Sequence, residues 1–323
     1  MVTSPPFDIT AEILALTQQI SRELGKIAGS RKGSAAIILR RINNIKTIQA
    51  SLAIEGNTLS VEQITAILEG RRVIGPKRDI EEAKNALEVY GQLSSFDPLF
   101  CKDLLKAHSI MMRGLIDDGG KFRSSGVGVF AGGVVVHMAP PAKRVPRLID
   151  DLFAFINRND DLPWIIKACI FHYELEFIHP FSDGNGRIGR LWQHLLLMRE
   201  DPIFEYIAVE TLIRENQKEY YSVLGQCDKE GKSTQFIVFS LEQILAALSS
   251  FQAQTAHIVE GPKERLAFAR FKLGTTWFSR KDYLDLHETI STATASRDLA
   301  YAAKHKMLKQ EGSRNKTRYR FPN

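Results

Sequence analysis

The stretch His179-Pro180-Phe181-Ser182-Asp183-Gly184-Asn185-Gly186-Arg187-Ile188-Gly189-Arg190 decides the fold of this chain. An apolar run follows it at helical spacing, so the stretch predicts a loop that opens a helix. Gly184 and Gly186 flank Asn185, and residues that tolerate unusual backbone angles can turn several amide groups toward one point. The positive end of the helix dipole adds to this concavity, so we expect an anion to bind there.

The charged residues of the same stretch indicate which anion this is. Arg187 and Arg190 lie three residues apart and share one helix face, and their guanidinium groups match the oxygens of a phosphate. Asp183 stands beside this polyanion site, which favours a bridging Mg²⁺. His179 can accept a proton from an attacking hydroxyl near neutral pH. Each residue alone fits a turn with a core histidine and solvated arginines, but the whole set favours a reactive site.

The twelve residues match the pattern His-x-Phe-x-Asp/Glu-Gly-Asn-Gly-Arg-x-x-Arg and thus resemble the signature of the Fic family. The resemblance implies a mostly α fold: a Fic-type helical core with a small β-hairpin flap. It also implies Mg²⁺-dependent transfer of a nucleoside monophosphate, typically AMP from ATP, to a Ser, Thr or Tyr hydroxyl of a protein, with release of pyrophosphate. The implied roles are general base for His179, Mg²⁺ ligand for Asp183, phosphate binding for Gly184, Asn185 and Gly186, and β- and γ-phosphate binding for Arg187 and Arg190.

A second informative segment is Ser51-Leu52-Ala53-Ile54-Glu55-Gly56-Asn57. If Gly56 supplies the left-handed residue after a helix, Glu55 lies at the negative helix end, where a carboxylate needs a cation. Taken alone, Glu55 fits a solvated helix-end acid. The segment resembles the Ser/Thr-x-x-x-Glu-Gly/Asn inhibitory motif of Fic proteins whose inhibitory helix precedes the core. That resemblance implies that Glu55 reaches Arg190 and blocks placement of the γ-phosphate, with Ser51 supporting the helix.

Capping residues predict the helices of an N-terminal helical region, residues 1–95. We expect one helix from Asp8 to Gly29 and another from Ser34 toward Gly56. Ser60 and Gln63 form a capping box for a third helix, and Asp79 with Glu82 is expected to repeat this device. Asp97-Pro98 is expected to cap the next helix, which begins the catalytic core, residues 96–260.

A change of periodicity inside the core predicts a hairpin around Gly132-Gly133, with apolar strand positions at Val127, Val129, Val134, Val135 and Val136. In Fic proteins the corresponding flap, here about residues 122–141, docks the backbone of the target. A purely structural hairpin is the alternative. Farther along, resemblance places Tyr220 or Tyr221 against the adenine, while core packing is the alternative for both. His172, inside an apolar helix that leads to His179, is expected to be a core histidine.

The C-terminal segment, residues 262–323, resembles a winged helix-turn-helix domain. We expect helices from Ser279 to Leu286 and from Ser296 to Lys309, followed by a basic hairpin from Gly312 to Phe321. This segment is either a DNA-binding domain or a protein-interaction module. The side chains expected to face phosphates are Arg297, Lys304, Lys306, Arg314, Lys316, Arg318 and Arg320.

Composition agrees with this division of the chain. The formal net charge is +6, yet residues 262–323 carry 14 Lys and Arg against 6 Asp and Glu, so the basic excess is entirely C-terminal. Cys101, Cys169 and Cys227 are expected to be buried free thiols. We find no apolar run of about 20 residues and no signal peptide at the start, so we expect a cytoplasmic protein without a membrane partner.

Two classes of function follow. The first is an adenylyltransferase autoinhibited by Glu55, with ATP and a target protein, or the chain itself, as its partners. The second is a DNA-binding regulator whose Fic core only senses nucleotide, although such a sensor would not need His179. A bifunctional enzyme that also removes AMP is a further alternative, since Glu55 could orient a water. A homodimer is compatible with the sequence, which identifies neither the target nor the oligomeric state.

Overall fold

The computed structural model describes residues 4–29, 33–126, 128–131, 134–257, 261–287, 290–312 and 317–322. Side chains are not described at residues 29, 33–42, 128–131, 134–138, 256–257 and 271. The chain forms two compact units. The first contains Met1–Gly29 and Asn43–Phe251, and the second contains Ser30–Ile42 and Gln252–Asn323.

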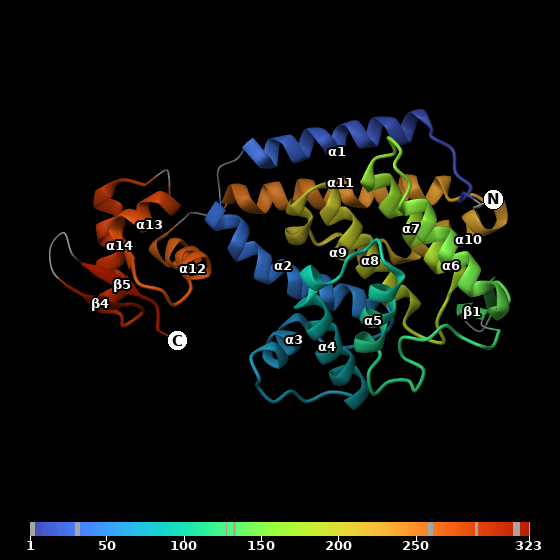
Figure 1. The fold of residues 1–323 in the computed structure, drawn as a ribbon, viewed down its shortest axis with the longest axis horizontal. Coiled ribbons are helices and arrows are strands. Elements are labelled where there is room, and N and C mark those ends of the chain that lie inside the picture. The colour runs from blue at the N-terminus through green and yellow to red at the C-terminus, as the bar shows by residue number, and fades with distance from the viewer. Residues whose placement is uncertain are drawn as a thin grey trace. The chain divides into compact units, whose positions relative to one another are not determined.

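Helices make up most of the first unit (Figure 1). They are α1 (Ala11–Gly29), α2 (Gly33–Ile54), α3 (Val61–Leu68), α4 (Lys77–Tyr90), α5 (Cys101–Met111), α6 (Val145–Ile156), α7 (Trp164–Ile178), α8 (Asn185–Glu200), α9 (Val209–Glu215), α10 (Gln217–Glu230) and α11 (Thr234–His257). Short 3-10 helices occur at Leu93–Ser95, Ala142–Arg144 and Pro202–Tyr206. The first residues of α2 and the last of α11 belong to the second unit. The helical core expected from the sequence is thus present.

Helices α7 and α8 pack against one another at the centre of this unit and deliver the two ends of the signature loop. Eleven of the 15 residues of α7 are buried, so the helix is apolar on nearly every side, as expected of a central helix. Gly189 allows the close approach, because a β-carbon there would lie 3.0 Å from Glu176 Oε1 and 3.2 Å from His172 Cδ2. This packing fixes where His179 and the start of α8 lie.

The long helix α11 requires a correction to the sequence analysis. Its segment Thr234–Thr255 is long and apolar enough, by length and composition only, to cross a membrane. However, 61% of an 18-residue stretch of that segment is buried inside the protein, as in the core helix of a globular unit.

The chain's N-terminal segment is tied to the start of α11, where the backbone N–H of Ser233 donates to Pro6 O at 2.9 Å.

The predicted hairpin is present as β1 (Gly128–Ala131) and β2 (Val134–Met138), paired antiparallel with a register irregularity between Val129 and Phe130. Its turn, Gly132-Gly133, and the predicted strand residue Val127 lie outside the described residues. The structure also does not describe the side chains of the other predicted flap positions, which are Val129, Val134, Val135 and Val136.

Helix caps were predicted with mixed success. The capping box of Ser60 and Gln63 is confirmed. The backbone N–H of Ser60 donates to Gln63 Oε1 at 2.8 Å, and the backbone N–H of Gln63 donates to Ser60 Oγ at 3.3 Å. The second box is wrong: α4 begins after Pro76 without a side-chain cap, and Asp79 instead accepts from the backbone N–H of Thr58 at 2.8 Å. Likewise α1 is capped by Thr10 rather than by Asp8, whose side chain pairs with Lys232. Asp97 does not cap α5 either, since that helix begins at Cys101.

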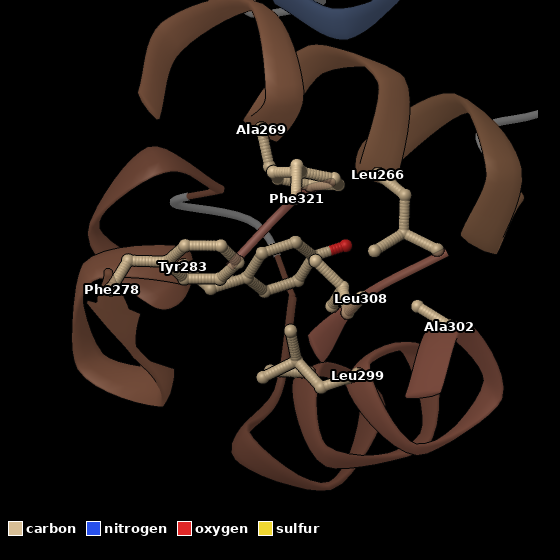
Figure 2. Close-up of a cluster of buried hydrophobic side chains, with 9 residues drawn as sticks. Leu266, Ala269, Phe278, Tyr283, Leu299, Ala302, Leu308 and Phe321 are labelled. Carbon is tan, nitrogen blue, oxygen red and sulfur yellow. The ribbon is translucent and has the colours of Figure 1, made fainter. Parts of the chain in front are cut away.

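The second unit contains a small helical domain with one sheet (Figure 2). Three strands, β3 (Phe278–Ser279), β4 (Lys309–Glu311) and β5 (Arg318–Arg320), pair in the order β3-β5-β4, with β5 antiparallel to both neighbours. The buried core brings together Leu266, Tyr283, Leu299, Leu308 and Phe321 from five parts of this segment. The elements are α12 (Pro262–Leu273), β3 (Phe278–Ser279), α13 (Arg280–Leu286), α14 (Thr292–Lys304), β4 (Lys309–Glu311) and β5 (Arg318–Arg320).

The last helix starts earlier than the sequence predicted. Ser291 caps α14 by accepting from the backbone N–H of Thr294 at 3.1 Å, so the helix begins at Thr292 and not at Ser296. It also ends earlier, at Lys304 and not at Lys309, and the strands after it begin at Lys309 and not at Gly312. Of the three cysteines, all free, Cys169 and Cys227 are buried as expected, whereas Cys101 is only half-buried.

Candidate active site

The signature residues form a tight loop between α7 and α8. His179 follows the last residue of α7 in a left-handed conformation, with φ 49° and ψ 61°, so the chain turns sharply there. Its Nδ1 lies 3.3 Å from the carbonyl oxygen of Glu176. If Nδ1 carries the proton and donates to this oxygen, Nε2 presents a lone pair. His179 is half-buried, so the ring lies at the edge of the protein interior.

The loop is fixed by the Asn185 side chain, which is 2% exposed. Its Oδ1 accepts from the backbone N–H of Phe181 at 2.9 Å, and its Nδ2 donates to the carbonyl of the same residue at 3.0 Å. Both ends of the amide are therefore used within the loop.

A residue that sequence reasoning missed, His108 on α5, holds the other side of the loop. Its Nδ1 accepts from the backbone N–H of Gly120 at 2.9 Å, which places the proton on Nε2, 2.9 Å from the carbonyl oxygen of Asp183. The ring stacks on Phe181 with 3.6 Å between centroids. Burial lowers the pKa of His108 to about 4, so the ring is neutral near pH 7 and keeps this bonding pattern.

Arg123, on the segment between α5 and the flap, also organises the loop. Its buried guanidinium donates to four backbone carbonyls, among them His179 O at 2.7 Å from Nε and Ser125 O at 2.8 Å from Nη1. The other two acceptors are the carbonyls of Pro140 and Ile178. Arg123 therefore ties the end of α7 to both sides of the flap, which makes it a positioning residue for His179.

The glycines of the signature leave room for the loop and for an anion. Gly184 has φ 84°, and a β-carbon there would lie 2.6 Å from Met112 Sδ, so only glycine fits. At Gly186 a β-carbon would collide with Oε1 of Glu55. The first amide groups of α8 have no acceptor within the helix because of helix geometry. The carboxylate of Glu55 thus lies at the positive end of α8, where the sequence predicted an anion.

Arg190 is bound by the end of α2. Its Nη2 donates to Glu55 Oε1 at 2.7 Å and to Ser51 O at 2.9 Å, and its Nε donates to Ser51 Oγ at 3.1 Å. Its side chain is 1% exposed, whereas that of Glu55 is 29% exposed. Burial opposes the charge of Arg190 and is the largest single influence, but the interactions with Glu55, Tyr220 and Glu176 together outweigh it and raise the pKa of Arg190 above its ordinary value. Gly56 has the left-handed φ of 90° predicted for it.

Arg187 is bound by a different carboxylate. Its Nη1 donates to Glu82 Oε1 at 2.9 Å, and its Nη2 donates to Asp183 Oδ1 at 2.7 Å. Glu82, on α4, also accepts from Asn57 Nδ2 at 3.0 Å, and the more exposed Arg78 reaches Asp183 Oδ2 at 2.9 Å. The sequence predicted Glu82 as part of a capping box with Asp79. No local pattern could have marked it, because its partner lies 105 positions away.

The site fits a nucleotide phosphate with Mg²⁺. Among the described residues, Arg187 Nε and Arg190 Nη1 are buried without an acceptor, so each guanidinium keeps a donor for a further oxygen. No group of three or more His, Cys, Asp or Glu side chains that could hold a metal occurs among those residues. Asp183, 39% exposed, would thus be joined by phosphate oxygens and water around Mg²⁺, the coordination that this ion prefers.

The two tyrosines expected near the adenine differ in their surroundings. Tyr220 is 1% exposed, packs against Phe236 and lies with its hydroxyl 3.2 Å from Nε2 of the buried His172. It is therefore part of the core in this structure and presents no face to a nucleotide. Tyr221 is 42% exposed, and its hydroxyl lies 3.5 Å from the carbonyl oxygen of Ile54, beside the end of α2. Only Tyr221 is accessible to a base.

The helical core and the signature loop that opens α8 define a protein of the Fic/DOC class, and the model of the Fic/DOC family matches residues 98–197. A Fic family protein from Desulfovibrio desulfuricans G20 has a solved structure that is 39% identical, covers 99% of each chain and superposes with a TM-score of 0.76. This chain therefore belongs to the Fic family. A Fic domain containing signaling protein from Bacteroides thetaiotaomicron shares the fold at 20% identity, with a TM-score of 0.61 over 77% of this chain and 100% of that one.

Curated relatives carry an activity in their names. A protein adenylyltransferase Fic from Aedes aegypti is 31% identical over 207 residues, which cover 60% of this chain and 39% of that protein. A protein adenylyltransferase fic-1 from Caenorhabditis briggsae is 34% identical over 189 residues, which cover 54% of this chain and 34% of that protein. The chain thus spans little more than a third of the length of these two relatives.

Proposed function

We propose that this protein is a Mg²⁺-dependent protein adenylyltransferase, autoinhibited by Glu55. It transfers AMP from ATP to a Ser, Thr or Tyr hydroxyl of a target protein, or of the chain itself, and releases pyrophosphate. The observation that carries the proposal is the pair of buried arginines, each with an unused donor, at the amide-lined start of a helix whose preceding loop carries His179. The names of the distant relatives support the same activity.

Each residue of the site has its own role in the reaction. Arg187 and Arg190, with the first amides of α8, hold the β- and γ-phosphates and disperse the charge that develops on the leaving pyrophosphate. The target hydroxyl oxygen forms a bond to the α-phosphorus as the bond to the β-phosphate oxygen breaks. His179 accepts the hydroxyl proton at Nε2, while the Glu176 carbonyl fixes its tautomer through Nδ1. Arg123 and His108 keep this loop in place.

Asp183 would hold the Mg²⁺. When bound, the ion neutralises phosphate charge and polarises the reacting phosphoryl group. In the structure the carboxylate of Asp183 is neutralised by Arg187 and Arg78. Binding of the metal would therefore free one donor of Arg187 for a phosphate oxygen.

Inhibition by Glu55 is supported by direct competition. The carboxylate takes Nη2 of Arg190 and lies against Gly186, both of which a γ-phosphate would need. The ion pair of Glu55 with the buried Arg190 competes with the nucleotide unless Glu55 swings outward. The side chain of Glu55 is 29% exposed, so Glu55 has room for this movement. The same exposed carboxylate could orient a water for removal of AMP, which is the alternative activity of this site.

Three regions complete the proposal. Residues 1–95 contain the inhibitory helix, residues 96–260 form the catalytic core, and residues 262–323 form a winged-helix domain. The flap strands β1 and β2 dock the target backbone, and Tyr221 is the better candidate for contact with the adenine.

The test is incubation of purified protein with ATP labelled at the α-phosphate and with Mg²⁺, read by gel autoradiography. We expect His179→Ala to lose transfer by roughly 10²-fold or more while nucleotide affinity, measured by calorimetry, stays within a few fold, because only proton removal is lost. Undiminished label on this variant would overturn the role of His179. A core that only senses nucleotide would bind ATP and leave wild type and variant equally unlabelled.

A further inference from the structure

The exposed side of α14 has an unusual composition. Ala293, Arg297, Ala300 and Lys304 recur at spacings of four, three and four residues and are all exposed, so they form one stripe along the helix. We call these four residues the α14 surface. The opposite side of α14 is buried: Ala295, Leu299 and Ala302 belong to the core of the second unit (Figure 2). The stripe is thus the solvent face of an amphipathic helix, with two cations and two methyl groups.

No carboxylate offsets these cations on the described part of α14. Its one acidic residue, Asp298, points inward, where it accepts from Arg265 at 2.6 and 2.9 Å and from the hydroxyl of Tyr283 at 3.2 Å. Asp298 is 1% exposed, so its charge is used inside the unit. The α14 surface therefore presents uncompensated positive charge, and an ordinary solvated helix face would mix both signs.

A third cation joins this surface from the preceding helix. Arg280, exposed at the start of α13, donates from Nη1 to Oγ of Ser296, one position before Arg297, at 3.1 Å. The bond ties the first residue of α13 to the first half of α14. The two cations of the α14 surface, Arg297 and Lys304, are separated by seven residues, or about 10 Å along the axis at 1.5 Å per residue.

The sheet of the same unit carries a second basic surface. Lys309 lies directly opposite Arg320 in the antiparallel pair of β4 and β5, while Arg318, two positions along β5 on the same face, lies opposite Glu311, so this face carries three cations and one carboxylate. Like charges directly opposite one another are unfavourable, so this pairing is relieved by an anion. Two elements, α14 and the hairpin, independently favour an extended polyanion over a single small ligand.

We propose that the second unit binds double-stranded DNA, with the α14 surface in the major groove and the strands β4 and β5 against the backbone. The small side chains Ala293 and Ala300 let α14 approach closely, and the major groove of B-form DNA, about 12 Å wide, admits a helix. Arg297, in the first half of the helix, reaches base edges or phosphates, and Lys304 reaches a phosphate. An A-form RNA duplex is disfavoured because its major groove is too narrow for side chains to read.

The test uses the full chain and a fluorescein-labelled 25-base-pair DNA duplex, with affinity measured by anisotropy across a salt series. The variant Arg297→Gln/Lys304→Gln is compared with Lys263→Gln/Lys272→Gln, which removes two exposed cations from α12. Both variants carry the same net charge, so a difference between them reports position. We expect the α14 variant to bind at least about tenfold more weakly and its salt slope to fall by about 2, against less than half of each effect for the α12 variant.

Several outcomes would overturn the proposal. One is the absence of DNA binding by wild type at micromolar protein and 50 mM salt, which would leave a protein-interaction module. Another is equal weakening by both variants, which would mean charge attraction without a defined surface. A third is equal binding of an RNA duplex of the same length. Unchanged thermal unfolding of the α14 variant excludes misfolding, and His179→Ala should bind DNA like wild type, so this test does not depend on the proposed activity.

Discussion

Arg190 and Arg187 lie one helical turn apart on α8, yet the carboxylates that bind them differ in how firmly they are held. Glu55 follows the end of α2 and is 29% exposed, while Glu82 lies within α4 and is 9% exposed. Glu82 also accepts from Asn57 Nδ2, so its carboxylate is bound from two sides. We infer that Glu55 is a displaceable partner that blocks Arg190, whereas Glu82 is a permanent partner that aims Arg187.

Removing Glu55 should have the largest effect. A bias of about 2.8 kcal/mol keeps roughly 99% of molecules inhibited, at 1.4 kcal/mol per tenfold, so Glu55→Gly should raise auto- and target modification by up to about 100-fold. Label incorporation from ATP at saturating Mg²⁺ measures this increase.

Two controls belong to this experiment. Glu55→Gly combined with His179→Ala should stay silent, and Arg190→Ala should not activate, because it frees Glu55 but removes a phosphate ligand. Equal labelling of wild type and Glu55→Gly would show that the contact between Glu55 and Arg190 does not inhibit.

Glu82→Gln should act in the opposite direction. The amide keeps the shape and one acceptor for Arg187 but loses the charge that orients the guanidinium. In a Glu55→Gly background we expect kcat/KM for ATP to fall about tenfold, and the free energy of unfolding to fall by about 2 kcal/mol because a buried charged hydrogen bond is lost. Steady-state kinetics and urea unfolding measure these changes. Activation by Glu82→Gln would mean that Glu82 is a second inhibitory carboxylate, and the distinction drawn above would be lost.

The smallest effects should separate the two supports of Glu82. Asn57 is buried, and Asn57→Ala should lower the free energy of unfolding by about 1 to 2 kcal/mol, because Glu82 loses a donor inside the protein. Arg78 also donates to Glu82, from Nε to Oε1 at 3.3 Å, but its side chain is 56% exposed, so Arg78→Ala should lower the free energy of unfolding by less than about 1 kcal/mol. Urea unfolding of the two variants side by side measures both. Equal losses of unfolding free energy in the two variants would mean that the exposed Arg78 stabilises Glu82 as much as the buried Asn57 does.

Local patterns were reliable where all the atoms they need are close in sequence. The loop that opens α8, the capping box of Ser60 and Gln63 and the left-handed Gly56 were predicted correctly. The pattern of Asp79 and Glu82 has the same form as a capping box but no cap forms, because Pro76 precedes the helix and both carboxylates find partners elsewhere. A cap is a weak interaction, so a buried arginine outcompetes it.

Resemblance supplied one long-range contact that residues alone could not. Glu55 and Arg190 are 135 positions apart, and their pairing was expected only because the segment resembles an inhibitory motif. Neither His108 nor Glu82 was anticipated at the site, because no motif marked His108 and Glu82 stood only in a capping-box pattern. Tyr220 and Tyr221 are adjacent and alike in sequence, yet one is buried against Phe236 and the other is exposed, since neighbouring helix positions face different sides.

The sequence by itself determined the helical class and the loop that opens α8 with its two arginines, because a glycine turn, a helix start and two arginines one turn apart are contiguous. The tertiary structure alone decided which carboxylate meets which arginine, and how firmly. Those pairings join α8 to α2 and α4 across more than a hundred positions, and they depend on how the helices pack. Burial sets the strength of each pair, and burial is a property of the packed core.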